Sequence, residues 1–475
     1  MIGSVRATRR TMRLLRLGRR HDGRTCVIAL VVAIAACSPD QIVGSGSLPP
    51  GVVDPGITKT PAGALAAYRG TLALFAQAFG GSFGGSNGIS HIVVAGILSD
   101  ELQANSVGDL NTADPLDSRV LPELSNPALE QFQTYLGDYR GLQQVRGQAE
   151  EARGLLEAYG GDSGKVLVGH LYAIEAYSEL FLADLFCSGI PLSTVDYNGD
   201  YTYAQGSTTS EVYQHAATFF DSTIFRSTDS ARILNLALIG KARALLALGR
   251  YGEAGQAVAA VPDGFQYTES FAAATVASNA ANFALVTPPG GEGPWIASVS
   301  DREGIDGLDY RSSRDPRTSA TPLGPNIFGT TLYHPDKYAT DGSSSIVLAD
   351  WVEARLIEAE VALQAGDVPT WLAKLNHLRE TAITPALPDT TDPGTPDGRV
   401  NLLFRERAFW LFLTGHRQGD LRRLIRQYGR DQSQVYPSGL YPGGTGTYGA
   451  DITAPIPALE RQYNPRFAGC ASRGA

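Results

Sequence analysis

Four acidic residues stand close together in one stretch of the chain that has no helical periodicity. They are Asp301, Glu303, Asp306 and Asp309. Two carboxylates held close together can act as acid and base in glycoside hydrolysis, and several can ligate Ca²⁺. The spacing does not meet the calcium-loop pattern, because Ile305 occupies a ligand position. We interpret the stretch as a solvated acidic loop and keep the hydrolytic pair as an alternative.

Other signals of enzyme chemistry are missing from the sequence. The seven His are scattered, and no two have the spacing of a zinc site on one helix. The chain has neither a Gly-rich phosphate loop nor a nucleophile elbow. The sequence therefore reveals no cofactor or metal site and predicts a protein without enzymatic activity, with an all-helical polysaccharide hydrolase or lyase as the alternative.

Aromatic residues suggest a different chemistry, the stacking of sugar rings. An exposed aromatic face with amide or carboxylate groups beside it suits a sugar, which has apolar C–H faces and a rim of hydroxyls. The candidate ligand-binding residues between positions 283 and 340 are Trp295, Tyr310 and Tyr333. A rival platform consists of the alternating residues Tyr197, Tyr201 and Tyr203.

The first residues have the pattern of a targeting segment. Residues 1–36 carry eight Arg and one acidic residue, and an apolar run of 11 residues extends from Cys26 to Ala36. That run suits a signal peptide and is too short to span a membrane. It ends at Ile34-Ala35-Ala36-Cys37, which resembles a bacterial lipobox and implies cleavage before a lipidated Cys37. An ordinary secretory signal with an incidental Cys is the alternative.

The composition limits what the remainder can be. The chain has 475 residues, of which 43% are hydrophobic, so it can bury a core of two or three domain-sized units. Its formal net charge is -9, and removal of residues 1–36 leaves about -16. So acidic a protein is a poor partner for nucleic acid. Residues 37–60 are rich in Ser, Pro and Gly and are typical of a flexible tether.

Helical periodicity dominates the rest of the chain. Apolar residues recur at three- and four-residue steps in the segments 61–79, 126–158 and 165–187, and the last is apolar enough to be central. Residues 231–262 read as two helices joined at Gly249-Arg250-Tyr251, which resembles a tetratricopeptide unit. A second such unit begins at Trp351.

Periodicity is lost between these units. Residues 263–346 contain several Pro-Gly and Asp-Gly turn signals, and loops this long in a compact domain are usually functional or disordered. We therefore divide the mature chain into a helical region 61–262, a loop-rich ligand-binding excursion 263–346 and a region 347–475 with helices and an irregular tail. Cys187 and Cys470 remain after loss of the leader; a disulfide between them and two unpaired thiols are both compatible with the sequence.

Several short motifs occur in an order typical of one family. The C-terminal ones are Glu406-Arg407-Ala408, Gly415-His416-Arg417 and Asp420-Leu421-Arg422-Arg423. Others are Ser99-Asp100-Glu101-Leu102, Asp315-Pro316-Arg317 and Pro455-Ile456-Pro457 with Asn464-Pro465. Together they resemble the SusD/RagB family of outer-membrane nutrient-binding lipoproteins. The resemblance covers nearly the whole mature chain.

The resemblance implies a mainly α fold, a tetratricopeptide-like helical core with long irregular loops. It also implies a non-catalytic lipoprotein at the cell outer membrane, anchored through lipid and exposed at the surface. Such a protein would bind an oligosaccharide, or a peptide, and deliver it to a TonB-dependent outer-membrane transporter of the SusC type. A helical scaffold that binds only protein is a further alternative, as repeat folds often have that role.

The charges of residues 402–423 are interpreted from the residues themselves. Apolar side chains surround most of this helix, so Arg405, Glu406 and Arg407 are expected to be partly buried, and buried charges must be paired. Asp420 and Arg417 are the expected partners, across a corner at Gly415. We interpret this cluster as a structural ion network.

Overall fold

The computed structural model describes most of the chain from residue 58 onward. The described ranges are 58–81, 90–104, 114–122, 133–161, 164–196, 198–271, 297–325, 330–339, 343–442 and 446–474. The predicted signal peptide, Cys37, most of the tether and Trp295 lie outside these ranges. The described residues belong to the compact unit Gly56–Ala475.

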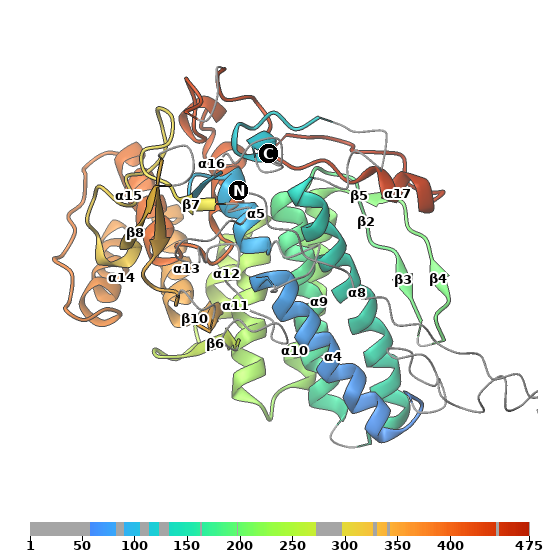
Figure 1. Ribbon diagram of the computed structural model, residues 1–475. Helices are drawn as coiled ribbons and strands as arrows, with labels where there is room; N and C mark the ends of the chain where they lie inside the picture. Colours follow the sequence, from blue (N-terminus) through green and yellow to red (C-terminus); the bar gives the residue numbers. More distant parts are fainter. Residues whose placement is uncertain are drawn as a thin grey trace, which may run out of the picture. The chain divides into compact units, whose positions relative to one another are not determined.

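Successive helices of the chain pack side by side, each mainly on its neighbour in sequence (Figure 1). They are α4 (Pro61–Gly80), α8 (Thr134–Tyr159), α9 (Gly164–Leu185), α10 (Thr209–Arg226), α11 (Ala231–Ala247), α12 (Tyr251–Val258), α13 (Trp351–Gln364) and α14 (Val368–Thr381). The shorter or later helices are α5 (His91–Leu98), α6 (Asp114–Asp117), α15 (Pro396–Trp410), α16 (Arg417–Tyr428) and α17 (Ala458–Tyr463), with 3₁₀ turns η3 (Pro316–Thr318) and η4 (Gln432–Gln434). The prediction of a mainly helical fold is confirmed.

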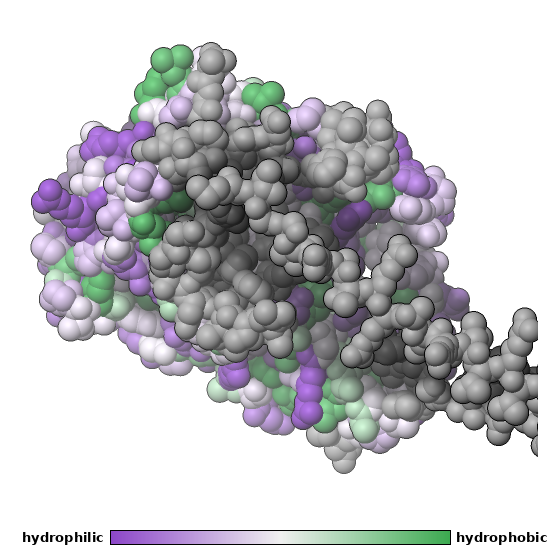
Figure 2. Space-filling model, in the orientation of Figure 1, coloured by the Kyte–Doolittle hydropathy of each residue, from purple (hydrophilic) through white to green (hydrophobic). Residues whose placement is uncertain are grey.

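Helix α9 is the centre of this arrangement. Among the described residues it is the one helix long and apolar enough to cross a membrane, and 83% of its most apolar window is buried inside the protein. It packs between α8 and α10, and its aromatic residues Tyr177 and Phe181 are fully buried. Hydrophobic and hydrophilic residues are interspersed over the coloured part of the face in Figure 2. Because α9 is mostly buried, its apolar side chains form part of the hydrophobic core of the protein.

The two tetratricopeptide-like units are present as expected. Helices α11 and α12 join at Gly249, whose φ of 71° is left-handed and suits glycine. Helices α13 and α14 join at Gly366, with φ of 76°, and Asp367 caps α14 by accepting a hydrogen bond from the Thr370 amide. Each turn reverses the chain, and α12 then packs on α13.

The described residues form five two-stranded antiparallel sheets beside the helices. The pairs are β1 (Leu102–Ala104) with β7 (Ala297–Val299), β2 (Ile190–Pro191) with β5 (Gly206–Ser207), β3 (Thr194–Val195) with β4 (Tyr201–Thr202), β6 (Gln266–Glu269) with β10 (Ile346–Asp350), and β8 (Ala320–Pro325) with β9 (Thr331–Pro335). The predicted loop-rich segment 263–346 therefore contains short strands as well as loops.

The corner between α15 and α16 holds the expected ion network, with one change of partner. Arg407 donates two hydrogen bonds to Asp420, as predicted. Arg417 instead donates to Asp100, at Nε–Oδ1 2.6 Å and Nη2–Oδ2 2.8 Å. Glu406 accepts from Arg317 of the Asp315-Pro316-Arg317 motif. The motifs Ser99–Leu102, Asp315–Arg317 and 406–423 are distant in sequence and meet here as one structural cluster.

Candidate functional site

The main candidate site is a cleft of about 830 Å³ along one face of α8. Its other walls are the β3–β4 hairpin and the segment from Pro457 to Asn464. The cleft is lined by four tyrosines, Tyr139, Tyr201, Tyr203 and Tyr463. Amide and hydroxyl side chains accompany them: Gln143, Gln144, Gln148, Ser193, Thr194 and Asn464. A cleft of this size and composition can hold a small organic ligand.

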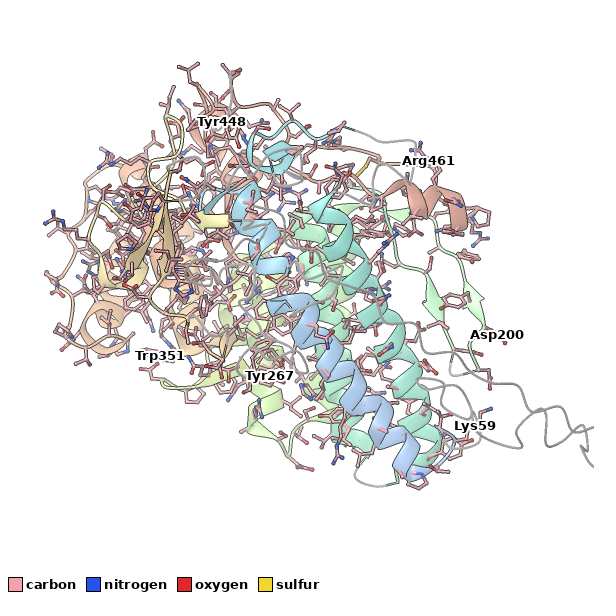
Figure 3. The ribbon with its side chains drawn as sticks, viewed as in Figure 1. Lys59, Asp200, Tyr267, Trp351, Tyr448 and Arg461 are labelled. Atoms are coloured by element: carbon pink, nitrogen blue, oxygen red, sulfur yellow. A yellow bond between two sulfur atoms is a disulfide. The ribbon has the colours of Figure 1, made fainter. Side chains whose placement is uncertain are left out.

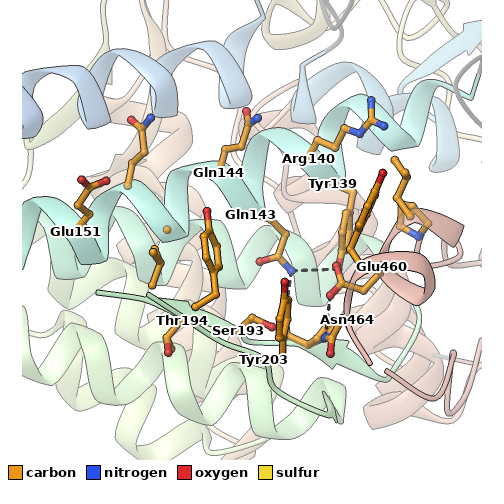
Figure 4. A pocket seen from close by; sticks show the side chains of 18 of the residues that line it. Tyr139, Arg140, Gln143, Gln144, Glu151, Ser193, Thr194, Tyr203, Glu460 and Asn464 are labelled. Atoms are coloured by element: carbon orange, nitrogen blue, oxygen red, sulfur yellow. Dashed lines mark hydrogen bonds between the residues drawn. The ribbon is translucent and has the colours of Figure 1, made fainter. Parts of the chain in front are cut away.

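Helix α8 supplies the floor because its two faces differ. Arg140, Gln144, Gln148 and Glu151 recur at three- and four-residue steps, so they lie on one face and line the cleft. Figure 4 shows Arg140 and Glu151 at opposite ends of this row. Partial burial raises the pKa of Glu151 above its ordinary value. The opposite face of α8 packs on α4 and α9.

The β3–β4 hairpin forms the aromatic wall. The Tyr201 and Tyr203 side chains are 69% and 39% exposed, and their rings stack with centroids 6.4 Å apart and an interplanar angle of 20°. Helix α8 holds the hairpin, because Glu150 accepts a hydrogen bond from the Val195 amide at 2.8 Å. Gly147 lets the strand approach closely, since a Cβ there would lie 3.3 Å from Val195 Cγ1. The exposed rings are therefore presented from a fixed strand.

The third wall comes from the segment around α17. Glu460 accepts hydrogen bonds from Tyr139 Oη at Oε2 and from Asn464 Nδ2 at Oε1, each 3.0 Å long (Figure 4). Burial and the nearby Glu460 carboxylate raise the pKa of Tyr139 well above its ordinary value. Asn464 also donates to Ala204 O in the chain just after β4. The wall is thus tied to both the floor and the hairpin.

A disulfide anchors this wall to the core. Cys187, just after α9, is bonded to Cys470, with Cα atoms 5.8 Å apart, and Figure 3 draws the bond in yellow. The sequence was compatible with either a disulfide or two unpaired thiols, and the structure contains the disulfide. The flanking backbone pairs as well, since Ser188 N donates to Ser472 O and Ala471 N donates to Ser188 O.

Buried charges lie beneath the floor of the cleft. Arg146 Nε donates to Glu179 Oε1 at 3.0 Å, and Arg146 Nη1 donates to Gln143 Oε1 at 2.9 Å. Gln143 in turn donates to Tyr139 Oη and to Pro191 O. These contacts fix the orientation of a lining amide, which is the preorganisation that a polar binding site needs.

The predicted ligand residues do not all fit an exposed platform. Tyr310 is fully buried against Phe409 and Phe412 and donates a hydrogen bond to Asp100, so the expectation that it offers a face to ligand is corrected. Tyr333 is half-buried, with the Arg311 guanidinium 3.8 Å from its ring centroid. Trp295 lies outside the described residues, as does Tyr197 of the rival platform.

The acidic loop also differs from the interpretation of a solvated loop. Glu303 is buried and accepts hydrogen bonds from Ser300 and Tyr448, and burial beside Asp117 raises its pKa well above its ordinary value. Asp301 accepts from two backbone amides, and Asp309 pairs with Arg405. Each of these carboxylates has a structural role, because the loop packs against other segments. Among the described residues, no three His, Cys, Asp or Glu side chains are grouped to hold a metal ion.

Comparison with solved structures identifies the architecture. A SusD superfamily protein from Bacteroides thetaiotaomicron superposes with a TM-score of 0.63 at 15% identity, over 86% of this chain and 99% of that one. A SusD superfamily protein from Bacteroides vulgatus gives 0.61 at 16% identity, over 87% and 99%. The chain has the SusD fold. A third structure of similar fold is surface glycan-binding protein A from Bacteroides uniformis, with a TM-score of 0.60 at 14% identity, over 85% of this chain and 99% of that one.

Two comparisons by sequence find no match. No sequence-family profile matches the chain, and no curated protein matches it. The SusD fold is therefore indicated by the order of short motifs in the sequence and is shown by the structural comparison.

Proposed function

We propose that this SusD-like protein is a non-catalytic binding protein that captures an oligosaccharide in the cleft on α8. The observation that carries the proposal is the pairing of exposed, stacked Tyr201 and Tyr203 with fixed amides across an 830 Å³ cleft. Tyrosine faces suit the apolar faces of sugars, and amides suit their hydroxyls. A neighbour with the same fold is described as a glycan-binding protein, which supports this ligand class.

The carboxylates of the cleft favour binding over cleavage. Glycoside hydrolysis needs two carboxyl groups about 5–10 Å apart on either side of the scissile bond. The lining carboxylates Glu151 and Glu460 lie at opposite ends of the cleft (Figure 4), and both oxygens of Glu460 are engaged by Tyr139 and Asn464. We therefore expect bound glycans to be recovered unchanged.

Calorimetric titration of a panel of oligosaccharides tests this function. We expect binding by the native protein, loss of affinity in Tyr203→Ala, and no release of reducing ends over long incubation. Tyr333→Ala and Trp295→Ala test the earlier candidate residues in parallel. The proposal fails if no glycan binds, if a glycan is cleaved, or if Tyr333→Ala and Trp295→Ala abolish binding while Tyr203→Ala leaves it unchanged.

We further propose that the protein is lipidated at Cys37, anchored in the outer membrane, and delivers its ligand to a TonB-dependent transporter. The lipobox-like sequence before Cys37 and the SusD fold support this placement. Mass spectrometry of the N-terminal peptide should find acyl chains on Cys37, and Cys37→Ser should leave the membrane fraction. Affinity capture from detergent extracts of the native host should recover a barrel protein at near-equal stoichiometry, and recovery of the protein alone would contradict the delivery role.

A further inference from the structure

One end of the cleft carries a positive charge, Arg140, that pairs with none of the described residues. Helix α8 contains Arg140, Arg146 and Arg153. Arg146 is paired with Glu179, and Arg153 with Glu175, both inside the protein. Arg140 lies on the opposite, cleft-lining face and makes no hydrogen bond or ion pair with any described residue. No described residue therefore occupies the donors of its guanidinium.

The two carboxylates that line the cleft keep their negative charge but form no ion pair with Arg140. Glu460 uses one oxygen for Tyr139 and the other for Asn464, which are both neutral donors. Glu151 is eleven residues further along α8, about 16 Å at 1.5 Å per residue, which is beyond the ~8 Å screening length at physiological salt. A ligand group placed beside Arg140 therefore meets a guanidinium that no described carboxylate pairs with, while Glu460 at the same end is a negative charge already held by Tyr139 and Asn464.

We propose that Arg140 selects glycans that carry a carboxylate, such as a uronic acid, at one end of the bound segment. The proposal rests on the proposed glycan-binding function. A guanidinium presents two parallel N–H donors that match a carboxylate, and a partly buried charged hydrogen bond of this kind is strong. Tyr201 and Tyr203 lie along the hairpin wall and would hold the adjoining neutral sugars. Glu151 at the far end disfavours a second acidic sugar there. A glycan with both neutral and acidic sugars should therefore bind better than a uniformly acidic glycan.

The test compares matched glycans that differ only in charge. The probes are glucuronosyl-xylotriose and a trigalacturonate, each beside its carboxyl-reduced neutral form, titrated into native protein, Arg140→Gln, Arg140→Lys and the control Arg69→Gln. Arg69 is an exposed arginine on α4 outside the cleft, so the control removes the same charge elsewhere. We expect glucuronosyl-xylotriose to bind native protein about 10- to 100-fold more tightly than its reduced form.

That preference should disappear in Arg140→Gln, persist in part in Arg140→Lys, and remain whole in Arg69→Gln. Trigalacturonate should show a smaller preference than glucuronosyl-xylotriose. Equal affinity for acidic and reduced forms, or a preference that survives Arg140→Gln, overturns the proposal. If the neutral forms bind in a Tyr203-dependent way, the glycan-binding function stands although the charge selection fails. If neither acidic nor neutral glycans bind, both proposals fall.

Discussion

Arg407 and Asp420 face each other across the corner at Gly415, with Nε–Oδ2 at 2.7 Å and Nη2–Oδ1 at 3.0 Å. Both side chains are buried, and Arg423 Nη2 donates to the same carboxylate at 2.8 Å. The two arginines hold the pKa of Asp420 far below its ordinary value despite the burial. These three residues join α15 to α16 and are shielded from solvent. Each charge is therefore stabilised mainly by its partners and not by water.

Replacement of Asp420 by Ala is therefore expected to destabilise the protein strongly. The change leaves the buried Arg407 guanidinium without its main partner, which costs about 3–5 kcal/mol of the free energy of unfolding. Urea unfolding measures this loss. The matched control is Asp397→Ala, whose side chain is 82% exposed and pairs with Arg430 at the surface, and there we expect less than about 1 kcal/mol. Equal losses in the two variants would contradict this account.

A second prediction concerns pH. Burial raises the pKa of Glu101 to about 8, and its Oε1 accepts a hydrogen bond from the Leu413 amide. The folded protein keeps this proton after the unfolded chain has lost it, so Glu101 lowers stability progressively as pH rises from about 5 to about 8.

Glu101→Gln removes that titration and keeps the acceptor oxygen. The free energy of unfolding of Glu101→Gln, relative to native protein, should therefore rise by about 3 kcal/mol between pH 5 and pH 8. Denaturant unfolding at several pH values checks this, with the exposed Glu380→Gln as the control. A difference that does not vary with pH would show that Glu101 ionises normally in the folded state.

A third prediction concerns the tyrosines. Removal of an exposed ring should lower glycan affinity, whereas removal of a buried ring should lower stability. Tyr201→Ala and Tyr203→Ala are expected to weaken glycan binding by about tenfold each and to leave stability nearly unchanged. Tyr310→Ala removes a fully buried ring and should cost about 3–5 kcal/mol of stability. Calorimetric titration and thermal unfolding, run on all three variants, separate the two effects. Loss of stability in the hairpin variants would mean that those rings support the fold.

The disulfide gives a fourth prediction. The double variant Cys187→Ser, Cys470→Ser frees the segment that carries α17, so stability should fall by about 2–5 kcal/mol. Glycan affinity should fall as well, since Glu460, Tyr463 and Asn464 would no longer be held against α8. Treatment of native protein with a reductant provides the matched measurement without substitution. Unchanged affinity in both would show that α17 is positioned by its other contacts alone.

The helical core could be predicted from the sequence because its signals are local. The apolar run of α9 and the glycine turns at Gly249 and Gly366 act within a few residues, and the structure has helices and turns at those positions. The Arg407–Asp420 pair was also predictable, since thirteen residues and one corner separate the partners. Arg417 was assigned wrongly because its true partner, Asp100, is more than three hundred residues away.

The candidate site was less accessible to prediction for the same reason. Tyr201 and Tyr203 were visible as an alternating pair, yet the floor on α8 and the wall at Glu460 join them only through long-range packing. The polar face of α8, with Arg140, Gln144 and Glu151 in helical register, was the one local sign of the cleft. The prediction that Tyr310 is exposed is wrong because a segment without helical periodicity can still be buried by long-range packing. The Tyr310 ring packs on Phe409.

The bond between Cys187 and Cys470 also bears on when the cleft can exist during biosynthesis. The floor and hairpin are translated early, but the wall from Pro457 to Asn464 follows much later, and its anchoring thiol Cys470 lies 283 residues after Cys187. A nascent chain therefore cannot present a complete cleft, and the bond itself awaits an oxidising compartment. If the cleft binds glycans as proposed, ligand capture would therefore depend on complete synthesis of the chain and on oxidation of these two thiols.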